Sequence, residues 1–315
     1  MIKGLSITPP IVGRISIGHV VERNGKRLPE KDDQFTITSQ VQTKDGWIPH
    51  PMDEELRQHS DNGKLRTIPI SLPFNDPDLN FRAEYTLFDR KSGRPICAGD
   101  GSTCKRVAKG SMESLPCPSP SFCDIGANGN CKPYGRLNVR IGDSDHLDTF
   151  IFRTTGFNSI RTLIARLEFY KAMSGDLLAC LPLELKLRGK STTQSYRAAI
   201  YYVDISVRTG MSLEDAITQA QTVHQQRINC GFDQQALDDA ARKGFENGCF
   251  EDNEEDGQDV IDEFYSKSQP SDSSSGNQPQ AQNNKHSKAI TLSDKLAIKN
   301  RLEKPSSNTK TGTDS

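Results

Sequence analysis

Apolar and polar side chains alternate in several segments of the first 155 residues. The segments 13–21 (GRISIGHVV) and 34–43 (QFTITSQVQT) place an apolar residue at about every second position, which is the pattern of a strand with one buried face. Asn24-Gly25 and Lys44-Asp45-Gly46 supply turn residues after these two segments. The same strand character recurs in three more segments, 80–88, 136–142 and 148–155. We therefore predict a mostly antiparallel sheet, in which residues 65–73, with two prolines, form an edge strand at best.

The first helical pattern lies in residues 159–173. One face of this segment is apolar, because its apolar residues recur with helical spacing: Ile160, Leu163, Ile164, Leu167 and Tyr170. Either Asn158 or Ser159 can cap its N-terminus. Two more strands are predicted after it, over residues 181–188 and 197–207. Strands and helix together predict an α+β core that spans residues 1–210.

The sequence changes character twice after this core. Ser212 and Asp215 have the spacing of a capping box, which predicts the start of a helix, and a second helix is predicted over residues 233–246. We assign residues 211–250 to a helical appendage of the core. From residue 251 onward, acidic residues and then Ser, Gln, Asn, Pro and Gly dominate. Such a composition cannot form a core, so residues 251–315 are predicted to be a disordered tail.

The overall composition is polar, with 34% apolar residues, a mean hydropathy of -0.64 and a net charge of -1 over 315 residues. The body before the tail carries a net charge of +3, which permits nucleic-acid binding but does not indicate it. No run of apolar residues is long enough to span a membrane. No apolar signal segment follows Met1, so we expect a cytoplasmic protein with reduced cysteines.

Five of the eight cysteines lie in residues 97–135, among Gly, Pro, Ser and Asn residues that favour turns. A segment so poor in large apolar residues needs a metal or a disulfide to order it. The spacing Cys104-x12-Cys117-x5-Cys123-x7-Cys131 suits Zn²⁺ held by four thiolates, with Cys97 as the competing ligand. No pair has the C-x2-C spacing, so free thiols stay an alternative, while disulfides are disfavoured in a reducing compartment. We predict a zinc-stapled loop that leaves the sheet, and a structural zinc, because four thiolates leave no open position.

Three further hypotheses about function rest on weaker sequence patterns. Gly189-Lys190-Ser191-Thr192 lacks the earlier glycine of a phosphate-binding loop. We therefore interpret it as the tip of a basic hairpin, in which Arg188, Lys190 and Arg197 could contact phosphate or an acidic partner.

A single-stranded DNA-binding module would need Tyr134, Phe150 and Phe152 to be exposed beside Arg136 and Arg140. A metal-dependent hydrolase would instead need oxygen or imidazole ligands. Asp143, Asp145 and His146 are the candidates for that role, but no H-E-x-x-H pairing occurs in the sequence.

Several motifs together resemble one known family. They are GRISIG at residues 13–18, Asn75-Asp76-Pro77 with the strand after it, CPSPSFC at 117–123 with CKPYGRL at 131–137, FIFRTTGFNSIR at 150–161, and LPL at 181–183. These motifs resemble the recombination directionality factor-like family of phages and integrative conjugative elements. Members from conjugative elements often carry the label "hydrolase or metal-binding protein". The likeness covers roughly residues 1–210.

The resemblance implies a non-enzymatic accessory protein of DNA recombination. Characterised members of the family bind a large serine integrase and switch it from integration to excision by protein contact. The family cysteines correspond to Cys117, Cys123 and Cys131, and the fourth ligand to Cys104 or Cys97. Residues after Ser212 lie outside the likeness, so the partner could instead be another recombination protein of the same element. Direct contact with DNA stays possible on this reading.

Overall fold

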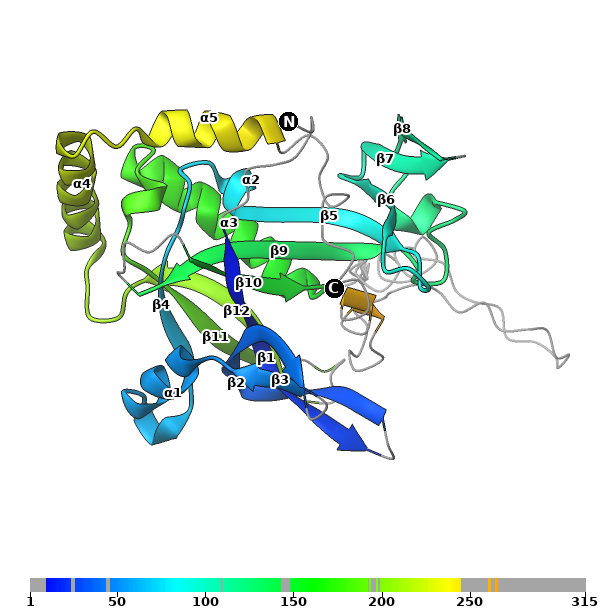
Figure 1. The fold of residues 1–315 in the computed structure, drawn as a ribbon, viewed down its shortest axis with the longest axis horizontal. Coiled ribbons are helices and arrows are strands. Elements are labelled where there is room, and N and C mark those ends of the chain that lie inside the picture. The colour runs from blue at the N-terminus through cyan, green and yellow to red at the C-terminus, as the bar shows by residue number, and fades with distance from the viewer. Residues whose placement is uncertain are drawn as a thin grey trace, which may run out of the picture. The chain divides into compact units, whose positions relative to one another are not determined.

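The computed structural model describes residues 10–23, 26–43, 46–108, 110–142, 148–191, 193, 197, 199–244, 260–261 and 264–265 (Figure 1). All of these residues belong to a first unit, Met1–Asp272, and the second unit spans Ser273–Ser315. The predicted tail lies, apart from residues 260–261 and 264–265, outside the described residues. No described helix is long and apolar enough to cross a membrane.

A long sheet forms the frame of the first unit, with strands in the order β3-β2-β1-β10-β9-β5-β6-β7-β8. The strands on this path are β1 (Ile11–Arg23), β2 (Lys26–Thr43), β3 (Gly46–Pro49), β5 (Phe81–Phe88), β6 (Pro95–Gly99), β7 (Thr103–Ala108), β8 (Ser111–Pro116), β9 (Lys132–Ile141) and β10 (Thr149–Thr154). Strands β1 and β10 pair in parallel. The other pairings between described strands are antiparallel, which confirms the predicted α+β class with a mostly antiparallel sheet.

Three further strands branch from β9. Strand β4 (Thr67–Ser71) pairs with β9 and with β11 (Leu183–Ser191), and β11 pairs with β12 (Ala199–Val207). The prediction of an edge strand at residues 65–73 is therefore wrong. The pairing of β4 with β9 joins only Ile70 to Ile141 and Ser71 to Arg140. Pro69, the residue before Ile70, contributes only its carbonyl oxygen, which accepts a hydrogen bond from Gly142 N at 2.9 Å, because proline has no N–H to donate.

The prediction that residues 97–135 leave the sheet as a loop is wrong for their first half. Cys97 lies in β6 and Cys104 in β7, and β6, β7 and β8 extend the sheet as consecutive antiparallel strands. Short turns at Gly101 and Gly110, both with positive φ, join these strands, which is the conformation that glycine adopts at least cost. Only the part after β8 runs as a loop, interrupted by the 3₁₀ turn η2 (Pro120–Phe122).

The main core lies between the sheet and α3 (Phe157–Ser174). Leu163 and Leu167 of α3 are fully buried there, together with Phe35 and Ile37 of β2 and Val203 of β12. The remaining helices are α1 (Pro51–Gln58), α2 (Pro77–Asn80), α4 (Leu213–Asn229) and α5 (Gln234–Gly244), with 3₁₀ turns η1 (Asp61–Gly63) and η3 (Leu178–Cys180). The sequence did not predict α1 or α2, both of which begin with a proline after a capping side chain.

The two helices after the core follow the prediction closely. The capping box at the start of α4 is present, since the Ser212 hydroxyl accepts a hydrogen bond from Asp215 N and the Asp215 carboxylate accepts one from Ser212 N. Ala216 and Ala220 of α4 are fully buried in the main core. Helix α5 instead packs Ala241 against Phe74. These helices are thus part of the packed body.

Candidate metal centre in the cysteine-rich segment

One face of β5, β6 and β7 forms the floor of the candidate site. Leu87 of β5 pairs with Cys97 of β6, and Cys97 pairs with Arg106 of β7. Because directly opposed residues of an antiparallel pair point to the same side of the sheet, these three side chains share one face. Gly99 pairs with Cys104, and a Cβ on Gly99 would lie 2.5 Å from Cys104 Cβ. The glycine therefore lets Cys104 pack beside Cys97.

The loop after β8 brings three more cysteines over this face. Cys117 N donates a hydrogen bond to Ser102 O at 2.8 Å, which fixes the start of the loop. Gly126 N donates to Cys123 O at 3.1 Å, and Cys131 N donates to Gly126 O at 3.3 Å. A Cβ on Gly126 would lie 2.9 Å from Cys131 Cβ and 3.3 Å from Cys123 Cβ. Only a residue without a side chain leaves room for these two cysteines side by side.

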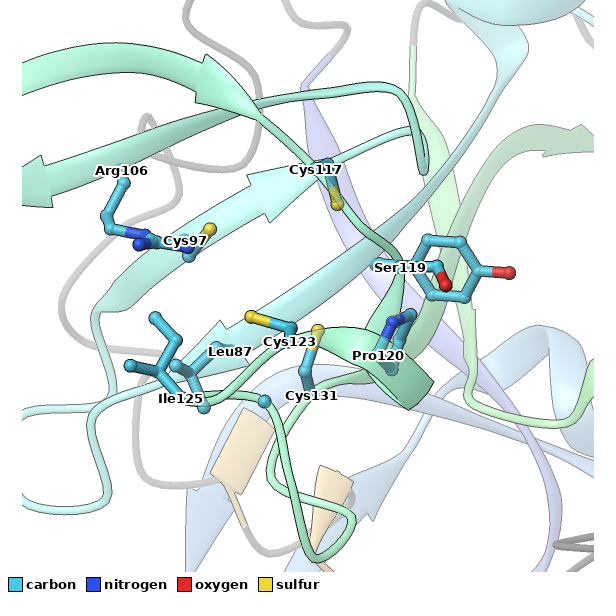
Figure 2. A pocket seen from close by; sticks show the side chains of 11 residues that line it. Leu87, Cys97, Arg106, Cys117, Ser119, Pro120, Cys123, Ile125 and Cys131 are labelled. Carbon is cyan, nitrogen blue, oxygen red and sulfur yellow. The ribbon is translucent and has the colours of Figure 1, made fainter. Parts of the chain in front are cut away.

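Four cysteines line one small pocket between the floor and the loop: Cys97, Cys117, Cys123 and Cys131. Figure 2 shows their sulfur atoms around a common space, with Arg106 and Leu87 at its side. The cavity volume is about 10 Å³, which is about what a single water molecule needs. Pockets that bind small-molecule substrates are far larger, about 300–1,000 Å³. The pocket thus has room for one ion and none for a substrate.

Two thiols of this cluster, those of Cys104 and Cys131, have raised pKa values. Burial, and then the neighbouring cysteines, raise the pKa of Cys131 to about 12. Burial and a hydrogen bond with Cys97 raise the pKa of Cys104 to about 11. A hydrogen bond with Cys97 raises the pKa of Arg106. Several thiolates can coexist in such a place only with a strong positive charge among them, which a divalent metal supplies.

The predicted ligand set and the pocket differ at one position. Cys117, Cys123 and Cys131, three of the four predicted ligands, line the pocket, and the fourth cysteine that lines it is Cys97. Cys104 is 3% exposed and packs next to Cys97 in the same cluster. Within the described part of the chain, no group of three or more His, Cys, Asp or Glu residues already has an arrangement that could hold a metal ion. The described cysteines are all free thiols, and no disulfide joins any two of them.

The aromatic residues of the single-stranded DNA-binding hypothesis are buried. Tyr134, Phe150 and Phe152 are 3%, 3% and 1% exposed. Because bases stack only on accessible aromatic rings, the single-stranded DNA-binding reading that depends on them is wrong. Asp143, Asp145 and His146, the candidates for a hydrolytic site, lie outside the described residues.

An exposed apolar surface on the cysteine loop was not predicted from the sequence. The side chain of Phe122 is 81% exposed, and Ile125 is 44% exposed. Both border a second, open hollow of about 270 Å³ that reaches Arg106 and Asp124. The motif CPSPSFC contains the one signal that could have indicated it, an aromatic residue within a run of turn-forming residues.

A second unpredicted feature joins residues 260, 261, 264 and 265 to the base of the cysteine loop. Val260, Ile261 and Phe264 are buried against Phe88 and Tyr134, with Tyr265 beside them. The Tyr265 hydroxyl donates to Phe88 O at 3.0 Å. The composition of this region predicted a disordered tail here, because these four apolar residues follow a long acidic run. The structure instead places them on β5 and β9.

The model of one known protein family matches this chain. A sequence model of the family described as Gp3-like, recombination directionality factor-like, matches residues 12–208, which is more than half of the chain. The match contains the described strands, apart from Ile11 at the start of β1, and the whole cysteine segment, and it agrees with the resemblance noted in the sequence. No curated protein and no solved structure matches the chain.

Proposed function

Since this chain belongs to the recombination directionality factor-like family, we propose that it is a non-enzymatic accessory factor of DNA recombination in a phage or integrative mobile element. It acts by contact with a site-specific recombinase, a serine integrase or another recombination protein of the same element. The single observation that carries the proposal is the cysteine pocket of about 10 Å³, which can hold an ion but no substrate. A loop built around such a pocket suits a structural role better than a catalytic one.

The proposed metal is a structural Zn²⁺ held by Cys97, Cys117, Cys123 and Cys131. Soft thiolates are the ligands that zinc prefers, and structural sites are four-coordinate and closed. Cys97 replaces Cys104 in this proposal because Cys97 lines the pocket and Cys104 does not. Arg106 lies opposite Cys97 and would offset part of the negative charge of four thiolates. Zinc supplies no reaction here, and it links the loop to β6.

The proposed recombinase contact is the exposed surface of Phe122 and Ile125. An aromatic side chain that is 81% exposed on an otherwise pinned loop has the character of a protein-binding anchor. The adjacent hollow could accept an apolar side chain of the partner. The metal and the contact are then linked, because loss of zinc would release the loop that presents Phe122.

The metal is tested by measuring the zinc content of the purified chain under reducing conditions. We expect about one zinc per chain, the stoichiometry of a single closed site. Cys97→Ser and Cys131→Ser should lose the metal, while Cys104→Ser and the core control Cys180→Ser keep it. Loss in Cys104→Ser with retention in Cys97→Ser would overturn the ligand assignment, and no zinc in the unmodified chain would overturn the metal.

The partner is tested by co-purification with the integrase and the other recombination proteins encoded by the same element. Phe122→Ser should weaken the complex at least tenfold, as loss of a binding anchor does. Phe169→Ser is the matched control, since Phe169 is 52% exposed on α3, away from the loop. Equal effects of the two variants would contradict the contact surface. Metal-dependent cleavage of DNA by the purified chain would contradict the non-enzymatic role.

A further inference from the structure

Strand β11 carries a row of three cations on one side of the sheet. Lys186, Arg188 and Lys190 occupy alternate positions, so their side chains share a face and follow one another at about 7 Å. Leu183 and Leu185 point to the opposite face, where they are fully buried in the main core. The cations therefore lie on the outer face of this branch of the sheet.

Each of these cations is held in place by a polar partner. Arg188 Nε donates to Asp204 Oδ2 at 2.7 Å, and Arg166 Nε of α3 donates to the other carboxylate oxygen, Oδ1, at 3.0 Å. One buried carboxylate thus fixes two guanidinium groups from different elements. Both bonds use Nε, which leaves the terminal nitrogen atoms of both groups for other acceptors.

The two lysines of the row are held separately. Lys186 Nζ donates to Glu184 Oε1 at 3.3 Å, and Lys190 Nζ donates to Asn158 Oδ1 at 2.7 Å. Glu184 also accepts hydrogen bonds from Thr209 N at 2.9 Å and from the Thr209 hydroxyl at 2.8 Å. The Glu184 carboxylate therefore keeps hydrogen-bond donors even without Lys186.

The acidic and basic groups of this network differ in how deeply they are buried. The side chains of Asp204 and Glu184 are 3% and 5% exposed, whereas those of Arg166, Arg188 and Lys186 are 46%, 44% and 34% exposed. The carboxylates lie beneath and the cations lie outside, so the surface that solvent meets is positive. This local charge contrasts with the net charge of -1 of the whole chain.

We propose that this face, formed by Arg166, Lys186, Arg188 and Lys190, binds the phosphate backbone of duplex DNA. None of the large exposed apolar side chains of the described chain lies in β11 or β12, so the part of the face that β11 forms is polar. Surfaces that bind DNA are polar and positively charged. Contacts of this kind position a protein on a duplex without reading its sequence, which suits a factor that works beside a DNA-bound recombinase.

The test is the salt dependence of binding to a labelled duplex of mixed sequence, measured by fluorescence anisotropy with the full chain. The variant is Lys186→Gln/Lys190→Gln, which removes two cations without leaving Asp204 unpaired. Each phosphate contact contributes about 0.9 to the slope of log affinity against log salt, so the slope should fall by about 1.8. Lys186→Arg/Lys190→Arg should keep the slope.

The matched control removes the same charge from other surfaces. Lys91 and Lys243 are exposed and lie outside the proposed face, so Lys91→Gln/Lys243→Gln should leave the slope unchanged. An equal fall in the slope in this control would overturn the proposal, because DNA binding would then depend only on the net charge of the chain. Absence of DNA binding at low salt would also overturn it. The proposal would also be overturned if Lys186→Gln/Lys190→Gln left the salt slope of DNA binding unchanged but lost binding to an acidic protein partner.

Discussion

The hydroxyl of Ser159, in the first turn of α3, accepts a hydrogen bond from the backbone N–H of Val203 in β12 at 3.1 Å. Among the described strands, β12 pairs with β11 alone, so its other edge has backbone groups that none of these strands satisfies. Val203 is fully buried, and water cannot serve its N–H. Helix α3 therefore closes this edge with a side chain, in the place where another strand would otherwise lie.

We expect Ser159→Ala to destabilise the protein by about 1–3 kcal/mol, the cost of leaving a buried N–H without an acceptor. The measurement is the free energy of unfolding in urea. Ser114→Ala, at an exposed position of β8, should change it by about 0.5 kcal/mol or less. Equal effects of the two changes would show that the bond to Val203 contributes nothing.

The carboxylate of Glu184 makes stability depend on acid. Burial raises the pKa of Glu184, but hydrogen bonds from Thr209, Lys186 and Ser206 outweigh it and hold the pKa below its ordinary value of 4.5. The unfolded chain then binds this proton more readily than the folded one. The stabilisation is present above pH 4.5 and is lost as pH falls through the lower pKa of the folded state.

Glu184→Gln should therefore be less stable than the unmodified chain at pH 7, with a smaller further loss between pH 4.5 and pH 3. Thermal unfolding across this range measures both effects. Asp238 provides a control of opposite sign, because burial raises its pKa. Asp238→Asn should make the loss of stability on acidification steeper. An acid limb in Glu184→Gln as steep as in the unmodified chain would contradict the assignment.

The contact between the segment around Phe264 and β5 depends on one aromatic ring. Phe264 is 1% exposed, and its ring centroid lies 4.9 Å from that of Phe88 and 5.8 Å from that of Tyr134. Phe264→Ala should remove about 3–5 kcal/mol of packing free energy. So short a segment cannot lose this much and stay packed on β5. We expect hydrogen exchange at Val260 and Ile261 to become fast while α3 stays protected. Phe232→Ala, at a ring that is 42% exposed, should leave exchange unchanged.

Sequence patterns predicted those elements whose signal is local. Alternation predicted β1 and β2, and the spacing of Ser212 and Asp215 predicted the start of α4. The role of Ser159 shows the limit of a local signal. The sequence offered it as a helix cap, whereas the residue at the N-cap position is Gly156, which makes no side-chain cap. The hydroxyl serves β12, and nothing near Ser159 in the sequence indicates that partner.

The cysteine segment shows the same limit at the candidate site. The alternation of apolar and polar residues in β6 and β7 is short and lies among cysteines and turn-forming residues. The sequence therefore predicted a loop for the whole segment. The proximity of Cys97 to Arg106 and of Gly99 to Cys104 follows from strand register, which depends on pairing across the hairpin and not on spacing between cysteines. The sequence could therefore predict three of the four cysteines that line the pocket, but not the choice between Cys97 and Cys104.

The close approach of Cys123 and Cys131 depends on Gly126. A Cβ at this position would lie 2.9 Å from Cys131 Cβ and 3.5 Å from Cys123 Sγ, so Gly126→Ala must push the two cysteines apart. If they share a zinc ion, as we propose, the variant should hold zinc at least tenfold more weakly, since ligand geometry governs affinity. Competition with a chromophoric chelator measures this. Ser121→Ala, at an exposed position of the same loop, is the control and should hold zinc as tightly as the unmodified chain. Unchanged zinc affinity in Gly126→Ala would mean that Cys123 and Cys131 do not bind the same ion.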